Sequence, residues 1–161
     1  MDDSGIEHRW SEYLDTYVQV GTAGGRVVSV SFTDEPDEES EEVGEDEKGK
    51  DALEAVFEYL ETGTRATPDV PYALTVSGLE RRALERTRDL PYGTTLTYDE
   101  FADSLGEDDV EAVRDALHKN PVPVVLPSHR VVEEDGVGGF TGQRRIKKLL
   151  LELEQRQEKG D

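Results

Sequence analysis

The feature that most constrains this sequence is the uneven distribution of its charge. Residues 34–47, DEPDEESEEVGEDE, contain ten acidic side chains and no basic one. Runs of like charge of this kind are typical of solvated segments, so we expect an acidic loop at residues 34–50. The chain on either side of the loop has the apolar patterning of folded structure.

The composition supports a folded but salt-adapted protein. Only 34% of the 161 residues are hydrophobic and 35% are charged, values that would indicate disorder if they were spread evenly. The formal net charge is -20, and twelve of the eighteen basic residues are arginines. We interpret this as adaptation to high salt, where self-repulsion is screened, and hence a halophilic source. An acidic protein that binds basic partners or simply stays soluble is the alternative.

Several classes of protein are disfavoured. The chain has no cysteine, which excludes disulfides and thiolate metal sites. With only His8, His118 and His129, a structural zinc site is not expected, and we predict no metal or cofactor. No apolar run approaches the roughly 20 residues of a membrane span, and the N-terminus lacks the pattern of a signal peptide. We therefore expect a cytoplasmic monomer that does not contact membranes.

The first third of the sequence predicts a small α/β domain, residues 1–65. Residues 13–32 alternate apolar and polar side chains around TAGG, which predicts a β-hairpin. Residues 51–61 place apolar side chains at helical spacing, namely Leu53, Val56, Phe57 and Leu60. The Gly-, Pro- and Thr-rich residues 62–72 predict a linker.

Beyond the linker the sequence predicts a mostly helical domain, residues 72–156. Three pairs fit the capping-box pattern at a helix start: Ser77 with Glu80, Thr97 with Glu100, and Asp108 with Glu111. They predict helices near 77–88, 98–105 and 109–119, the last two joined at helix-turn-helix spacing as in winged-helix-like folds. A fourth, amphipathic helix is expected at 143–154.

Four segments of this half carry a family resemblance. LPYGTTLTYDEFADSLG, NPVPVVLPSHRVV, GVGGFTG and LLLELE occur in this order within residues 77–155. Together they resemble the successive motifs of the O6-alkylguanine DNA alkyltransferases. The resemblance implies that a helix-turn-helix enters the minor groove of double-stranded DNA, that an alkylated guanine is flipped out, and that a cysteine in Pro-Cys-His-Arg takes its alkyl group.

The resemblance assigns roles residue by residue. Ser128 occupies the position of the acceptor cysteine, and His129 matches the histidine that deprotonates it through a water. Glu154 matches the carboxylate that orients this relay, and Asn120 the asparagine that braces the turn. Tyr98 matches the tyrosine that helps to rotate the nucleotide.

Further residues are expected to contact DNA. Val137, Phe140 and Thr141 fall on the loop that lines the pocket for the flipped base. Glu111 falls on the arginine-finger position, where a carboxylate meets phosphate repulsion, and Arg114, one turn later, is a candidate substitute finger. Arg130 is expected to contact phosphate, or else to form an internal salt bridge.

The serine decides how much of the family's chemistry is expected. A cysteine thiol, with an unperturbed pKa of about 8.5, becomes a soft thiolate beside histidine, whereas a serine hydroxyl ionises far less readily. We predict that the chain binds alkylated DNA without transferring the alkyl group to itself. An engineered cysteine-to-serine change in an active methyltransferase and a natural homologue like the alkyltransferase-like proteins both remain open, and other repair proteins are conceivable partners.

Two readings from other classes are kept. Ser128, His129 and Glu154 could form a hydrolytic triad, although adjacent side chains on an extended strand point to opposite faces. The second is a degenerate domain that serves as a protein-interaction module. It is favoured by Glu111, Asp115 and the acidic loop, and by the thirteen basic against eighteen acidic side chains in residues 77–161.

Overall fold

A four-stranded sheet forms the first part of the protein. The computed structural model describes residues 5–43, 51–62, 67–138 and 144–158. The strands, in the order β3-β2-β1-β4, are β1 (Gly5–Ser11), β2 (Thr16–Ala23), β3 (Arg26–Thr33) and β4 (Glu41–Glu42). β2 is antiparallel to both β1 and β3, while β4 runs parallel to β1. Within the predicted acidic loop, Glu41 and Glu42 therefore form a short strand, and residues 44–50 lie outside the described part.

The predicted hairpin exists but is only part of the sheet. β2 and β3 are joined by Gly24 and Gly25, whose φ angles of 59° and 78° match the left-handed turn that a two-residue hairpin needs. The hairpin begins at Thr16 rather than at residue 13. β1 was not predicted, because the partly exposed residues of GIEHRWS show no clear alternation.

The helix α1 (Asp51–Thr62) covers one face of the sheet. Its side chains Leu53, Val56, Phe57 and Leu60 are buried, as their spacing predicts. The segment predicted as a linker lies beside the sheet, because Val27 N donates to Pro71 O (2.9 Å) and Ala73 N donates to Val27 O (3.0 Å). The proposed division into residues 1–65 and 72–156 thus runs through a segment that is hydrogen-bonded to β3.

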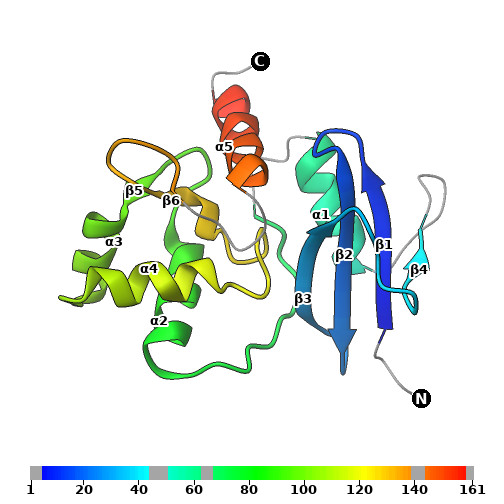
Figure 1. The fold of residues 1–161 in the computed structure, drawn as a ribbon, viewed down its shortest axis with the longest axis horizontal. Coiled ribbons are helices and arrows are strands. Elements are labelled where there is room, and N and C mark those ends of the chain that lie inside the picture. Colours follow the sequence, from blue (N-terminus) through cyan, green and yellow to red (C-terminus); the bar gives the residue numbers. More distant parts are fainter. Residues whose placement is uncertain (1–4, 44–50, 63–66, 139–143, 159–161) are drawn as a thin grey trace.

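The second part is mostly helical. It contains α2 (Gly78–Arg86), η1 (Thr87–Asp89), β5 (Leu96–Thr97), α3 (Tyr98–Leu105), α4 (Val110–His118), η2 (Ser128–Arg130), β6 (Val131–Val132) and α5 (Arg144–Glu158). The fold class, a small α/β part followed by a mostly helical part, is confirmed (Figure 1).

The three helix starts differ in how well they were predicted. The capping box at Thr97 and Glu100 is present in full. Ser77 makes no side-chain cap, because the next residue, Gly78, takes a left-handed φ of 63° at the start of α2. At α4 the cap is Asp109, whose carboxylate accepts from Ala112 N, and not Asp108.

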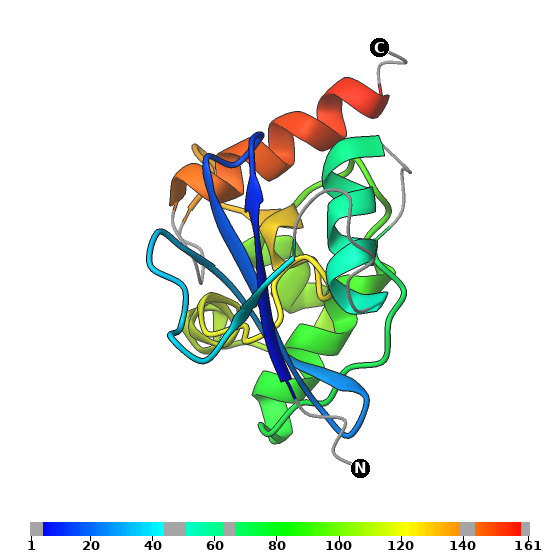
Figure 2. The ribbon, with the colours of Figure 1, turned by 90° about the vertical axis from the view of Figure 1, so that its right-hand side faces the viewer.

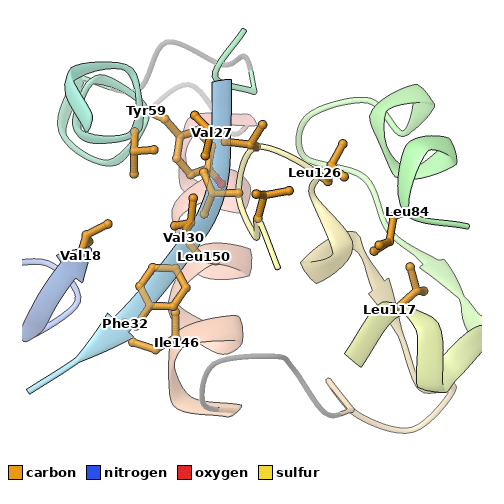
Figure 3. Packing of buried hydrophobic residues seen from close by; sticks show 14 of the residues in the cluster. Val18, Val27, Val30, Phe32, Tyr59, Leu84, Leu117, Leu126, Ile146 and Leu150 are labelled. Atoms are coloured by element: carbon orange, nitrogen blue, oxygen red, sulfur yellow. The ribbon is translucent and has the colours of Figure 1, made fainter. Parts of the chain in front are cut away.

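The helix α5 joins the two parts. Figure 1 shows it above both the sheet and α2–α4, and Figure 2 shows α1 beneath it. Tyr13 Oη donates to Leu149 O (2.5 Å), and Arg145 Nη1 donates to Leu14 O (2.6 Å). Figure 3 shows Ile146 and Leu150 of α5 packed near β3. Among the described residues, no helix combines the length and apolar character needed to cross a membrane.

Candidate active site

A braced turn presents Ser128. The Asn120 side chain is buried, donates to Leu126 O (2.8 Å) and Ser128 Oγ (3.0 Å), and accepts from Val122 N (2.9 Å). Within the turn, Val124 has a φ of 77°, an uncommon conformation for a β-branched residue. Such strain costs about 1–3 kcal/mol and persists only where surrounding contacts impose it. Asn120 supplies contacts of this kind on both sides of Val124.

The imidazole of His129 lies in a buried relay with Glu154. Ser128 and His129 are 3% and 0% exposed, and His129 Nε2 lies 2.7 Å from Glu154 Oε2. An ionised carboxylate only accepts hydrogen bonds, so Nε2 carries the hydrogen and Nδ1 carries the lone pair. Nδ1 is buried and has no hydrogen-bond partner among the described residues. It is therefore the atom of this imidazole that can accept a proton.

The Glu154 carboxylate accepts hydrogen bonds from several residues. Its Oε1 accepts from Arg130 Nε (2.9 Å) and Gly93 N (3.0 Å), and its Oε2 accepts from His129, from Arg130 Nη2 (2.9 Å) and from Tyr59 Oη (2.5 Å). Burial alone would raise the pKa of the Glu154 carboxyl, but His129 and Arg130 outweigh it and hold that pKa well below its usual value. Burial lowers the pKa of His129, while Glu154 opposes that change. The relay at neutral pH is therefore a carboxylate and a neutral imidazole.

Arg130 belongs to this relay and not to a DNA-contacting surface. Its side chain is 1% exposed, and besides the two bonds to Glu154 it donates to Leu90 O (2.8 Å) and Thr67 Oγ1 (3.2 Å). A guanidinium committed in this way cannot reach phosphate, so the predicted DNA contact was wrong and the internal salt bridge was right.

Tyr98 sits in a second buried cluster. Its hydroxyl lies 3.0 Å from His118 Nε2 and accepts from Lys147 Nζ (3.1 Å), which also donates to Val131 O (2.7 Å). Burial, aided by the charge of Glu133, raises the pKa of Tyr98 to about 12. Burial lowers the pKa of Lys147 to about 8. Tyr98, which is 2% exposed, is therefore covered, although the role assigned to it requires contact with a nucleotide.

Arg114, the candidate finger, covers Tyr98. It donates from Nε and Nη2 to the two carboxylate oxygens of Glu133 (3.0 and 3.1 Å), and it pairs with Glu111. Its guanidinium lies 4.9 Å from the centre of the Tyr98 ring. The arginine thus partly offsets the charges of Glu111 and Glu133, and it is engaged within the protein instead of extending from it. A surface hollow of about 290 Å³ lies here, lined by Thr97, Tyr98, Asp99, Arg114, Glu133, Glu134 and Asp135.

The loop expected to line the base pocket is described only in part. Phe140 and Thr141 lie outside the described residues. Val137 lines a different hollow, together with Tyr13, Lys148 and Leu151. In the described part of this loop, Gly138 also lies against Tyr98: its φ is 77°, and an added Cβ there would come within 3.2 Å of the tyrosine ring and hydroxyl.

The structure thus brings Asn120, Ser128, His129 and Glu154 together and places Tyr98 and Arg114 in a neighbouring cluster. Sequence reasoning missed Tyr59, His118, Glu133 and Lys147. The sequence could have predicted Lys147, because residues 147, 150 and 154 share one face of the predicted helix. Leu150 was expected to face inward, and Glu154 was expected to belong to the site.

Known proteins resemble this chain in both sequence and fold. The family model "6-O-methylguanine DNA methyltransferase, DNA binding domain" matches residues 78–156. A methylated-DNA–protein-cysteine methyltransferase from Archaeoglobus fulgidus is 34% identical over 152 residues, 91% of this chain and 95% of that protein. The Mycobacterium tuberculosis O6-methylguanine methyltransferase superposes with a TM-score of 0.76 at 24% identity, over 94% of this chain and 93% of its own. The same species' protein solved in complex with DNA gives a TM-score of 0.74 at 22% identity, over 93% of each chain.

The fold is that of the O6-methylguanine methyltransferase from Mycobacterium tuberculosis. The extent of the match to the Archaeoglobus fulgidus protein shows the family: the chain belongs to the methylated-DNA–protein-cysteine methyltransferases. The position that the sequence resemblance assigns to the acceptor cysteine carries Ser128, and the chain contains no cysteine.

Proposed function

We propose that this protein binds double-stranded DNA, recognises a guanine alkylated at O6 after it leaves the base stack, and does not accept the alkyl group itself. The observation that carries the proposal is the environment of Ser128. The braced turn holds the Ser128 hydroxyl through Asn120, and the next residue, His129, belongs to the buried relay with Glu154, yet no thiol stands at position 128.

The chemistry of transfer explains why the reaction stops. In transfer to a cysteine, a new sulfur–carbon bond forms as the bond between the alkyl carbon and guanine O6 breaks, so the acceptor must first lose its proton. A thiol with a pKa of about 8.5 can do so beside a histidine. The Ser128 hydroxyl accepts a hydrogen bond from Asn120, and the next residue in the chain, His129, has an imidazole whose pKa is lowered by burial. It is therefore a poor nucleophile at neutral pH.

Recognition requires the cluster around Tyr98 to open. A base can reach Ser128 only if it is extruded from the duplex, a step that costs a few kcal/mol. Tyr98 is covered by Arg114, Glu133 and Gly138, so the Arg114–Glu133 pair must separate or shift when a nucleotide is admitted. Arg114 would then be released from Glu133 and could serve as the finger that the family places one turn earlier.

The acidic charge shapes the conditions under which binding occurs. With a net charge of -20, long-range repulsion opposes the approach to DNA at low ionic strength. At about 1 M salt the screening length falls to about 3 Å, and only short contacts contribute. We propose that binding rests on such contacts and that the protein works in a saline environment.

The test is a fluorescence-anisotropy titration of two matched duplexes, one with a single O6-methylguanine, at low salt and at about 1 M KCl. Preference for the alkylated duplex supports the proposal, and the unmodified duplex controls for binding to DNA in general. Equal binding to both duplexes would refute lesion recognition.

A protein-interaction module is the second candidate, favoured by Arg114, which is held by Glu111 and Glu133 over the tyrosine. A folded protein that binds neither duplex at either salt concentration would favour it.

A further inference from the structure

The helix α1 contributes a side chain to the relay from outside the segment that the family model matches. Tyr59 is 1% exposed. Its hydroxyl donates to Glu154 Oε2 at 2.5 Å and lies 3.4 Å from His129 Nε2. The match to the DNA-binding domain begins at residue 78, so Tyr59 lies before the matched segment, whereas its partners Glu154 and His129 lie within it. Figure 3 shows the Tyr59 ring directed from α1 into the core beside β3.

The protons in the relay assign a direction to each bond. Glu154 Oε2 is ionised and accepts from both Tyr59 Oη and His129 Nε2. Because Nε2 already carries a hydrogen, it cannot accept one from Tyr59, so the phenol proton points to the carboxylate. Tyr59 and His129 therefore share one acceptor atom, Glu154 Oε2. The hydrogen bond from Tyr59 reduces the negative charge that this oxygen offers to a protonated His129 imidazole.

We propose that Tyr59 is a positioning residue of the relay, which holds the His129 imidazole as the Nε2–H tautomer and sets how strongly Nδ1 holds a proton. The inference rests on the proposed function only in treating His129 as the base of the disabled transfer step. The N-terminal part of the chain is then a component of the active site as well as of the fold.

Other charges around the imidazole act in both directions. Glu154 of α5 favours the protonated form, whereas Arg130 of η2 and Lys147 of α5 disfavour it. Burial, reinforced by Glu154, raises the pKa of Tyr59 well above its usual value, so the phenol stays neutral across the working range. Tyr92, whose ring lies 6.0 Å from that of Tyr59, is a further titratable neighbour. Replacing Tyr59 by Phe therefore removes one hydrogen-bond donor and changes no charge.

The direct test is a pH titration of His129 by ¹⁵N NMR in the protein as it stands and in Tyr59→Phe. We expect the variant to raise the pKa of His129 by about one unit, a tenfold change in proton affinity. Tyr13→Phe is the matched control, since Tyr13 Oη also bonds to α5, at Leu149 O, but makes no contact with the relay. A His129 pKa that is measured in both proteins and is the same in folded Tyr59→Phe would overturn the inference.

A second measurement covers the case in which His129 stays neutral throughout the folded pH range. In Ser128→Cys, the pH dependence of thiol reaction with iodoacetamide reports the thiolate that the imidazolium stabilises. Adding Tyr59→Phe should lower the apparent pKa of the thiol by about one unit. Without the phenol, the Glu154 carboxylate stabilises the imidazolium more strongly, and the imidazolium in turn stabilises the thiolate. A depressed thiol pKa that Tyr59→Phe leaves unchanged would refute the role of Tyr59 alone. An ordinary thiol pKa in both variants would refute the relay as well. Neither readout involves DNA, so failure of lesion binding is a separate result.

Discussion

Removing the Asn120 side chain should show how much of the turn's stability depends on it. Asn120→Ala removes three buried hydrogen bonds, to Leu126 O, Ser128 Oγ and Val122 N. With about 1 kcal/mol per bond, and some additional cost for leaving buried partners unsatisfied, we expect a loss of about 3–4 kcal/mol.

The assay is urea denaturation followed by circular dichroism, with unchanged slope as the criterion for a comparable transition. The matched control is Asp115→Ala, an exposed position in the neighbouring helix α4, where we expect a change within about 0.5 kcal/mol. A cycle with Ser128→Ala isolates the Asn120–Ser128 bond, for which we expect a coupling of about 0.5–1.5 kcal/mol. A cost below about 1 kcal/mol for Asn120→Ala, with no coupling to Ser128, would refute the bracing role.

Three further predictions concern the buried charges and the cover over Tyr98. Glu154→Gln should cost about 3–5 kcal/mol at neutral pH, because it leaves a buried guanidinium uncompensated. The pKa of Glu154 is depressed in the folded state, so the stability that its carboxylate contributes is lost as the pH falls below 4.5, the ordinary pKa of the group. The difference in the free energy of unfolding between the parent and Glu154→Gln should therefore narrow below that pH, and a constant difference would contradict this. The pKa of Lys147 is lowered from 10.5 to about 8, so its buried charge destabilises the fold below pH 8. As the pH rises from 8 to 10.5, the free energy of unfolding of the parent should increase by about 3 kcal/mol relative to that of Lys147→Met. A difference between the two proteins that does not change with pH would refute this. Glu133→Gln should tighten binding to alkylated DNA about two- to fivefold by weakening the pair with Arg114, whereas Glu134→Gln, an equal charge change at an exposed neighbour, should have a smaller effect; equal effects would mean that charge alone is responsible.

Local signals predicted those elements whose cause lies within a few residues of chain. The Thr97–Glu100 capping box fixes the start of α3, and Gly24-Gly25 fixes the hairpin turn. Ser77 shows the limit of such signals, since a left-handed Gly78 alters the backbone at the helix start. β1 was missed because a partly exposed strand has no strong alternation to detect.

Most of the site was predictable only where the resemblance supplied it. Ser128, Asn120, His129 and Glu154 were brought together as expected, although Ser128 and Glu154 are distant in sequence. Arg130 and Tyr59 show what could not be derived. Whether a guanidinium faces DNA or a carboxylate depends on the packing of α5, and a tyrosine 95 residues before Glu154 becomes its partner only because α1 lies beneath that helix.

The most direct test of the central claim is mass spectrometry after incubation with DNA containing O6-methylguanine, for the protein as it stands and for Ser128→Cys. The account predicts no change in mass for the parent and one added methyl group on the cysteine of the variant. A methylated Ser128 in the parent, or a folded Ser128→Cys protein that stays unmodified, would contradict it.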